Sequence, residues 1–233
     1  MLKGYLARMY DDAHRVNDKY VLETLKQAGP FESLLDVGCW DGVLTLDYAK
    51  AAKVKRIYGI EVVKEKSVEA EKKGIVCYAL KADQDRWPFE DGSIDCVVSN
   101  QVIEHLSDVD HFFSEAARVL RKGGVLVTST NNLASWHNIF PLFFGWAPFD
   151  LTNSSKVSAG IGNPIAVHRG EKTELSTWTH KCVYTPRWLF EWQKLFGLSR
   201  RSFFGSGFYP LPPRVGNIFK NHAAFMIIAT VKR

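Results

Sequence analysis

The chain has 233 residues, of which 46% are hydrophobic and 24% are charged, and its formal net charge is +5 at neutral pH. This length is enough for one α/β domain with a substantial core, and the composition is ordinary for a soluble globular protein. The sequence excludes a membrane-spanning helix, because no run approaches about 18 apolar residues. It also excludes a signal peptide, because the N-terminus lacks an apolar core. We therefore expect a single-domain cytoplasmic protein.

Positive charge is concentrated in the C-terminal third. Residues 1–150 contain 18 basic and 22 acidic side chains, whereas residues 151–233 contain 12 basic and 3 acidic ones. A local field of this sign attracts acidic partners such as a phosphorylated metabolite, a lipid headgroup or a nucleic acid. The alternative is a solvated basic face without a partner.

The cysteines give no sign of a metal or redox site. Cys39, Cys77, Cys96 and Cys182 occur singly, without the Cys-x-x-Cys spacing of zinc and redox motifs. We expect reduced packing residues, and we predict no metal site.

The N-terminal segment, residues 1–29, is predicted to form one or two helices. Val21, Leu22 and Leu25 belong to an apolar pattern at helical spacing, and the pattern stops at Gly29–Pro30.

The next segment has the pattern of a strand, a tight turn and a helix. A short apolar strand is expected at about 33–37, and residues 43–52 place apolar side chains at helical spacing. Between them, Gly38 and Gly42 can take positive φ, which lets backbone N–H groups face a ligand. Such a turn lies at the carboxyl end of a strand, where open α/β sheets bind ligands.

Further strands are predicted along the chain, with helices after the first, second and fourth. They are expected at about 56–60, 75–80, 94–99 and 124–130, and the apolar run 223–231 is expected to be a buried strand. Alternation of strands and helices implies a parallel sheet. Glu61 ends the second strand, where one carboxylate can accept hydrogen bonds from two ribose hydroxyls, as in dinucleotide and adenosyl sites.

Residues 30–132 resemble the class I S-adenosylmethionine-dependent methyltransferases. The run 36–42, Asp-Val-Gly-Cys-Trp-Asp-Gly, is similar to the family's first motif, Asp-x-Gly-x-Gly-x-Gly, with Trp40 in place of the middle glycine. Residues 81–106 and 118–130 are similar to later segments of the small-molecule methyltransferase branch. The resemblance implies a Rossmann-like, doubly wound, seven-stranded α/β sheet, mostly parallel, with an antiparallel last strand.

The resemblance also implies which residues bind S-adenosyl-L-methionine. Asp36 would support the turn and the methionine amine, Glu61 would bind the ribose, and Asp83 would accept from the adenine amine. The indole of Trp40 must turn outward or cover the ligand. The alternatives are a turn residue for Asp83 and an exposed strand end for Asp36 and Glu61. The expected cofactor residues are Asp36, Gly38, Trp40, Gly42, Glu61, Asp83 and Asn100.

The chain after the fifth strand is expected to select the substrate. About 90 residues separate that strand from the last apolar run, too many for a plain connection. We assign 30–132 to the cofactor core, 133–219 to a cap insertion and 220–233 to a C-terminal strand. Within the cap, Thr185 as N-cap and Pro186 at the first helical position predict a helix at about 185–196.

One part of the cap, residues 135–149, is dense in aromatic side chains and contains two prolines. This composition suits a cover over an apolar pocket or a hairpin in peripheral contact with a membrane, and the alternative is a buried packing segment. Such a segment is too short to span a bilayer.

Three histidines are candidates for the base that some methyl acceptors require. His105 follows the fourth strand, near where the resemblance places the methyl group, and His137 and His180 lie in the cap. A hydroxyl acceptor benefits from such a base, whereas a carboxylate needs none. The sequence therefore predicts methyl transfer to an oxygen of a small-molecule or lipid-linked acceptor, which the basic rim suggests is acidic.

Three other functions are considered. A cofactor-binding regulatory or scaffold protein without turnover would explain Trp40. An NAD-dependent oxidoreductase shares the glycine turn, but Asp36 in that turn would repel a pyrophosphate. A nucleic-acid base methyltransferase would carry Asn/Asp-Pro-Pro-aromatic after the fourth strand, where this chain has Ser-Asn-Gln-Val at 99–102. The sequence carries no pattern that sets an oligomeric state.

Overall fold

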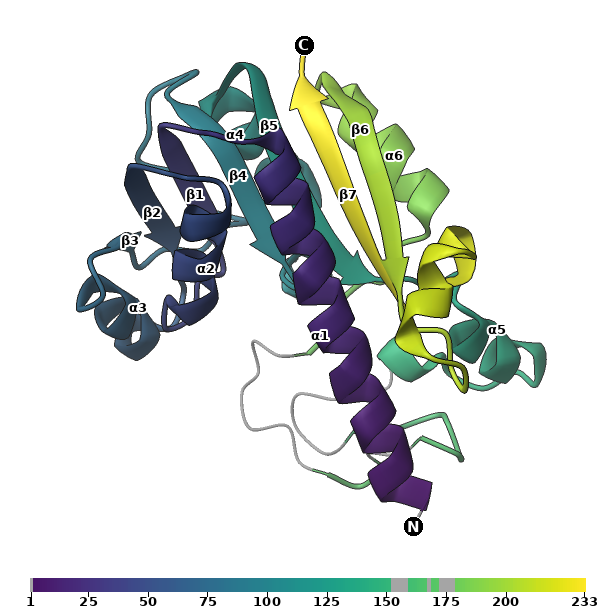
Figure 1. Cartoon of the computed structure of the whole chain (residues 1–233). Helices are drawn as coiled ribbons and strands as arrows, with labels where there is room; N and C mark the ends of the chain where they lie inside the picture. Colours follow the sequence, from purple (N-terminus) through teal and green to yellow (C-terminus); the bar gives the residue numbers. More distant parts are fainter. Residues whose placement is uncertain (1, 152–158, 167–168, 172–178) are drawn as a thin grey trace.

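The structure is a computed structural model that describes residues 2–151, 159–166, 169–171 and 179–233. A twisted sheet lies at its centre, with helices on both faces (Figure 1). Within the described residues, no helix combines the length and the apolar character needed to cross a membrane.

The sheet has seven strands in the order β3-β2-β1-β4-β5-β7-β6. Neighbouring strands from β3 to β5 are parallel, and β7 runs antiparallel to both β5 and β6. This is the mostly parallel, Rossmann-like sheet that the sequence predicted. The strands are β1 Ser33–Val37, β2 Arg56–Ile60, β3 Val76–Tyr78, β4 Ile94–Asn100, β5 Leu120–Asn131, β6 Leu198–Ser206 and β7 Phe225–Lys232.

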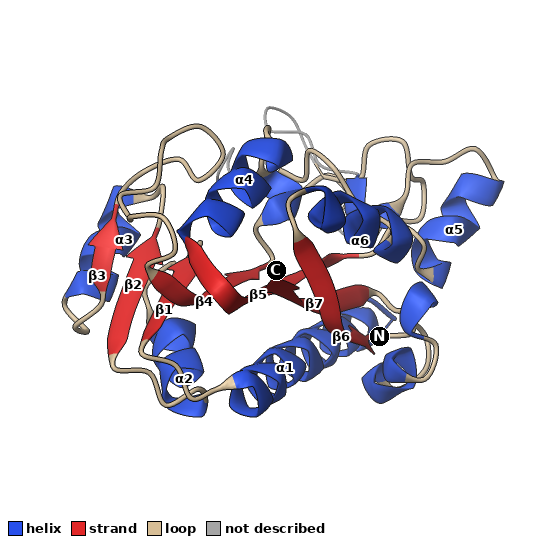
Figure 2. Cartoon of the chain, turned by 90° about the horizontal axis from the view of Figure 1, so that it is seen from above, coloured by secondary structure: helices blue, strands red, loops and turns tan. Residues whose placement is uncertain are grey.

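Helices cover the two faces of the sheet. Seen from above, α1 and α2 lie on one face and α4 and α6 on the other (Figure 2). The α-helices are α1 Leu2–Ala28, α2 Val43–Ala51, α3 Lys64–Glu71, α4 Val109–Val119, α5 Trp136–Phe143 and α6 Pro186–Leu195. Short 3-10 segments are η1 Ile103–His105, η2 Phe149–Leu151, η4 Pro213–Asn217 and η5 Lys220–His222.

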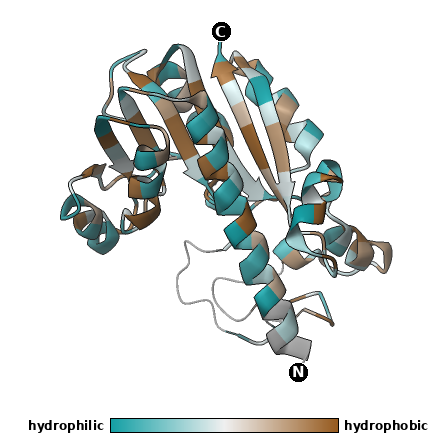
Figure 3. Cartoon of the chain, in the orientation of Figure 1, coloured by the Kyte–Doolittle hydropathy of each residue, from teal (hydrophilic) through white to brown (hydrophobic). Residues whose placement is uncertain are grey.

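Alternation along the strands builds a core on each face. Leu35 and Val37 pack with Phe112 and Phe113 of α4, whereas Leu34 packs on the α1 and α2 side, as a period of two requires. The strands are correspondingly the most hydrophobic part of the fold (Figure 3).

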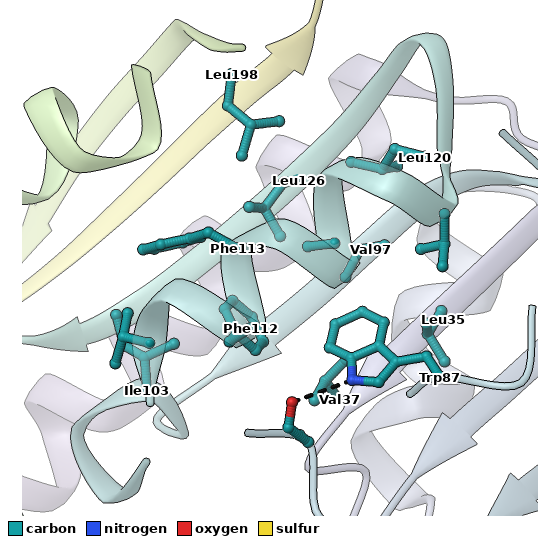
Figure 4. Close-up of a cluster of buried hydrophobic side chains, with 14 of the residues drawn as sticks. Leu35, Val37, Trp87, Val97, Ile103, Phe112, Phe113, Leu120, Leu126 and Leu198 are labelled. Atoms are coloured by element: carbon teal, nitrogen blue, oxygen red, sulfur yellow. Dashed lines mark hydrogen bonds between the residues drawn. The ribbon is translucent and has the colours of Figure 1, made fainter. Parts of the chain in front are cut away.

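Buried Trp87 anchors the loop between β3 and β4 against α4. Its indole Nε1–H donates to the carbonyl of Ala82 at 3.1 Å, and its ring meets Phe112 edge to face (Figure 4). Its backbone N–H donates to the carboxylate of Glu115 at 2.7 Å. These contacts fix the chain next to Asp83, so a packing residue determines where a candidate site residue lies.

The sequence did not locate β6. This strand forms the edge of the sheet and exposes Arg200 and Arg201, with an irregular register between Arg200 and Ser202. Charged, irregular edge strands lack the apolar pattern that reveals an inner strand.

The assignment of 133–219 to an insertion therefore needs adjustment. Within that range α6 packs on the core, and β6 completes the sheet. The helix prediction at 185–196 is confirmed, because Thr185 caps α6 by accepting from the Trp188 amide at 3.3 Å. Residues 152–158, 167–168 and 172–178 of the insertion lie outside the described part of the chain.

Candidate active site

The loop after β1 turns tightly at two glycines. Gly38 has a φ of 81°, and a Cβ there would lie 2.4 Å from Cγ2 of Val102. Gly42 has the same φ, and its Cβ would lie 2.5 Å from Cδ1 of Ile75. Positive φ and lack of space together require glycine at both positions.

Trp40 lies where the family's first motif has its middle glycine. Its φ is 48°, in the left-handed region that side chains rarely occupy. The half-buried indole lies against α3, where Lys66 Nζ is 5.1 Å from the ring centroid. The side chain is thus accommodated beside α3, while the backbone N–H of Trp40 faces Glu61.

Glu61, at the end of β2, is held by backbone amides. Its Oε2 accepts from the Trp40 N–H and its Oε1 from the Val63 N–H, both at 2.9 Å. The side chain is buried rather than an exposed strand end. Because a carboxylate oxygen can accept about two hydrogen bonds, each oxygen keeps acceptor capacity for a ligand hydroxyl.

Asp36 is buried within β1. Thr45 Oγ1 of α2 donates to its Oδ2 at 2.6 Å. The pKa of Asp36 is raised to about 7, mainly by burial; the hydrogen bond from Thr45 lowers it, and the charge of Glu61 raises it. The carboxyl therefore exchanges its proton near neutral pH, where a bound cationic group would favour the ionised form.

Asp83 and Asn100 are both tied to neighbouring elements. Asp83 Oδ2 accepts from the Ser107 amide at 2.6 Å, which fixes the loop beside η1. Asn100 Nδ2 donates to Asp18 Oδ1 and to the Tyr48 hydroxyl, both at 2.9 Å. Asn100 Oδ1 accepts from Nδ2 of Asn17 at 2.9 Å. The sequence analysis did not identify these α1 residues, whose role emerges only when α1 crosses the end of β4.

The structure brings the three candidate histidines together with Asp150. His180 Nδ1 lies 2.7 Å from the backbone carbonyl of Asp150, and His137 Nε2 lies 3.4 Å from its Oδ2. The rings of His105 and His180 are 4.9 Å apart between centroids. Burial, and then the neighbouring His180, lowers the pKa of His105 to about 4, so this ring is neutral at physiological pH.

Two buried carboxylates that the sequence analysis did not single out complete this group. Glu104 Oε2 accepts from Thr130 Oγ1 at 2.8 Å, and burial raises the pKa of Glu104. Asp150 Oδ2 accepts from Asn138 Nδ2 at 2.6 Å. Burial alone would raise the pKa of Asp150, but His137 lowers it below its ordinary value. Among these groups, only Glu104 and His105 are neighbours in the sequence.

Several buried polar atoms in this region have no hydrogen-bond partner. Buried polar groups are normally satisfied, so such atoms mark places where a ligand or water completes the structure. His14 packs on Phe225, and Tyr209 meets His137 edge to face at 5.1 Å. The unpartnered atoms include His14 Nε2, Glu104 Oε1, Asn131 Oδ1, Ser135 Oγ and Tyr209 Oη.

Comparison with known proteins identifies the family. The profile of the methyltransferase domain family matches residues 35–128, which contain the glycine turn, Glu61, Asp83 and the Glu104-His105 pair. Residues 35–128 of the chain therefore carry a domain of the class I S-adenosylmethionine-dependent methyltransferases. Their cofactor is S-adenosyl-L-methionine.

Individual relatives of this methyltransferase cover different parts of it. A probable S-adenosylmethionine-dependent methyltransferase of Mycolicibacterium smegmatis is 58% identical over 45 residues, which are 19% of this chain and 18% of that protein. A ubiquinone biosynthesis O-methyltransferase of Parvibaculum lavamentivorans is 29% identical over 128 residues, 51% of each protein. The chain thus matches less than two thirds of the length of these relatives.

The fold of this methyltransferase also matches a solved structure. A methyltransferase of Thermotoga maritima has a TM-score of 0.61 and 18% identity, over 95% of this chain and 91% of that one. At this identity the likeness establishes the fold.

Proposed function

We propose that this methyltransferase transfers the methyl group of S-adenosylmethionine to an oxygen of a small-molecule or lipid-linked acceptor. The observation that carries this proposal is the convergence of three histidines and two buried carboxylates near the carboxyl ends of β4 and β5. Groups of this kind can bind a hydroxyl and take the proton that it loses on methylation. The O-methyltransferase among the relatives is consistent with this assignment.

The cofactor would bind across the carboxyl ends of β1 and β2. The two oxygens of Glu61 would accept from the ribose hydroxyls, and Asp36 would balance the methionine ammonium. Asp83 would accept from the adenine amine. The backbone at Gly38, Trp40 and Gly42 would pass beneath the cofactor, and Asn100 would hold α1 at the methionine end.

His137 is the strongest candidate for the acceptor's base. Its Nε2 lies 3.4 Å from Oδ2 of Asp150, and a carboxylate in this position can orient the ring so that Nδ1 would take the proton of a hydroxyl. His105 is a weaker base, because a group with a pKa near 4 binds a proton poorly at neutral pH. Methyl transfer is an in-line displacement, so the remaining task of the site is to position the two reactants.

The exposed surface of α5 supports a lipid-linked acceptor. Trp136, Phe140, Phe143 and Phe144 are exposed, and Phe143 is 84% accessible. An apolar surface of this kind marks a site of contact with protein or membrane. This exposure is inconsistent with the alternative that residues 135–149 form a buried packing segment. We therefore propose that α5 contacts the lipid part of the acceptor or its membrane.

Calorimetric titration with S-adenosylhomocysteine, with NAD as the control, tests the cofactor assignment. We expect micromolar binding of S-adenosylhomocysteine alone, and binding of NAD instead would favour the oxidoreductase alternative. A panel of hydroxylated acceptors, each free and lipid-linked, is then assayed for S-adenosylhomocysteine release. Cofactor binding without turnover on any acceptor would favour the regulatory or scaffold alternative.

A further inference from the structure

Glu104, His105 and His180 form a group of potential metal ligands at the start of the cap. One ligand atom from each residue lies within 4.8 Å of those of the other two. Glu104 and His105 belong to η1 at the end of β4, whereas His180 comes from the segment that follows the insertion. The tertiary fold therefore assembles the group from two distant parts of the chain.

One carboxylate oxygen of this group lacks a partner among the residues that the structure describes. Glu104 is fully buried, and its Oε1 makes no hydrogen bond to any of them, although Oε2 accepts from Thr130. Leaving a buried carboxylate oxygen without a hydrogen bond destabilises the folded protein. A cation bound at Oε1 would remove this cost, which is an indication of a ligand independent of the histidine positions.

Hydrogen bonds to backbone carbonyls set the tautomers of both histidines. His105 Nδ1 lies 3.2 Å from the Thr179 carbonyl, and His180 Nδ1 lies 2.7 Å from the Asp150 carbonyl. A carbonyl can only accept, so each Nδ1 carries a proton, and in the neutral ring Nε2 is the nitrogen that can bind a metal ion. Metal-binding histidines are usually oriented by this kind of hydrogen bond from the other ring nitrogen.

We propose that Glu104 Oε1, His105 Nε2 and His180 Nε2 bind one divalent transition-metal ion. Two imidazoles and one carboxylate suit zinc, cobalt or manganese better than magnesium or calcium, which prefer all-oxygen sites. Ligands about 2.1 Å from a tetrahedral ion lie about 3.4 Å apart, so the group would contract by about 1 Å on binding. The expectation of no metal site rested on cysteine spacing and did not consider this group.

Three protein ligands leave a coordination position for an oxygen of the methyl acceptor, an implication that rests on the proposed function. A hydroxyl bound there would lose its proton more readily. The ion would also join η1 to the 179–182 segment, which is already linked by a 2.7 Å hydrogen bond from the Lys181 amide to the Glu104 carbonyl.

The test is metal binding by the purified, chelator-treated protein without acceptor or cofactor. The protein is titrated calorimetrically with Zn²⁺, and with Co²⁺ while its absorption spectrum is recorded. We expect one equivalent of metal and a cobalt spectrum of nitrogen and oxygen ligands. No stoichiometric binding would overturn the proposal, as would a thiolate charge-transfer band, which would place the ion on cysteines.

Three variants assign the ligands. Glu104→Gln and His180→Asn should each weaken binding at least about tenfold. The matched control is His222→Asn, because His222 Nδ1 also lies 2.7 Å from a backbone carbonyl, that of Ala134, but it is outside the group. Unchanged affinity in a folded His180→Asn variant, which alters only the cap, would overturn the assignment even if Glu104→Gln failed to fold.

Titration of the same samples with S-adenosylhomocysteine separates this proposal from the proposed function. Metal uptake without cofactor binding would support the metal site and contradict the methyltransferase assignment. Cofactor binding without metal uptake would support the methyltransferase assignment and contradict the metal site.

Discussion

The backbone amide of Trp40 donates to Oε2 of Glu61 at 2.9 Å, which joins the loop after β1 to the end of β2. The donor in this bond is the backbone N–H of Trp40, a group that every residue except proline has. It explains how a bulky residue occupies a position that usually holds glycine. The indole, meanwhile, packs towards Lys66. The shape of the cofactor loop therefore depends on the backbone at position 40 and not on the side chain.

Replacing Glu61 by alanine should weaken S-adenosylhomocysteine binding by roughly 1 to 3 kcal/mol, because charged hydrogen bonds to the ribose are lost. Calorimetry measures the change. The matched control is Glu65→Ala, since Glu65 is exposed on the first turn of α3. The Glu61 variant also loses the bonds to Trp40 and Val63, so thermal unfolding is measured in parallel. Unchanged cofactor affinity in a folded variant would contradict the ribose assignment.

The Trp40→Gly variant should retain cofactor affinity within about twofold. Glycine relieves the left-handed backbone strain of about 1 kcal/mol, and the indole contact that it removes is with the solvent-exposed amine of Lys66, so stability should change little. Trp40→Pro, which removes the amide donor, is expected to disrupt the loop. Calorimetry on both variants checks this. A tenfold loss of affinity in the glycine variant would mean that the indole covers the ligand.

Asp36 should make the stability of the cofactor-free protein depend on pH. Its folded pKa of about 7 lies above its ordinary value of 3.8, so the fold favours the protonated carboxyl. This contribution to the free energy of unfolding is full below about pH 4 and is lost as the pH rises through 7. Asp36→Asn should flatten that dependence, which urea unfolding between pH 5 and 8 measures. Asp47→Asn, at an exposed position of α2, should unfold with the wild-type pH profile.

Cofactor affinity should increase as the pH rises, whereas the contribution of Asp36 to stability decreases. If the ionised Asp36 balances the methionine ammonium, affinity at pH 8 should exceed that at pH 6 by about tenfold, because a group with a pKa near 7 is about one-tenth ionised at pH 6. The Asp36→Asn variant should bind more weakly, with little change between these pH values. Equal pH dependence in both proteins would exclude Asp36 as the source.

His137→Gln should lower turnover by about 10²- to 10⁴-fold once an acceptor is known, the usual contribution of a positioned base. Cofactor affinity should not change, since His137 lies in the cap beside Asp150. The control is His111→Gln, because His111 lies in α4 and its Nε2 contacts the Asp85 carbonyl instead of Asp150. Equal loss of turnover and of cofactor affinity would make His137 a structural residue.

Much of the fold could be predicted from local sequence. The five strands from β1 to β5 and β7 carry apolar runs, and α6 carries its own N-cap and terminal glycine. The turn at Gly38 and Gly42 and the position of Glu61 can also be predicted from local sequence. Each is recognised from residues that are close together in the chain: an apolar strand followed by two glycines, and an acid at the end of the next strand. The edge strand β6 could not be found in this way, since its exposed arginines hide the alternation.

The sequence by itself thus determined the strands β1 to β5 and β7, the turn at Gly38 and Gly42 and the acid at the end of β2, because each depends on residues close together in the chain. Only the tertiary structure decided which way Trp40 turns and which groups meet beside β4. Glu104 and His180 are 76 positions apart, and Asn17 reaches Asn100 across 83. Contacts between residues so far apart in the sequence depend on how the cap and α1 pack at the carboxyl edge of the sheet. Burial at this edge then shifts the pKa values of the groups that lie there.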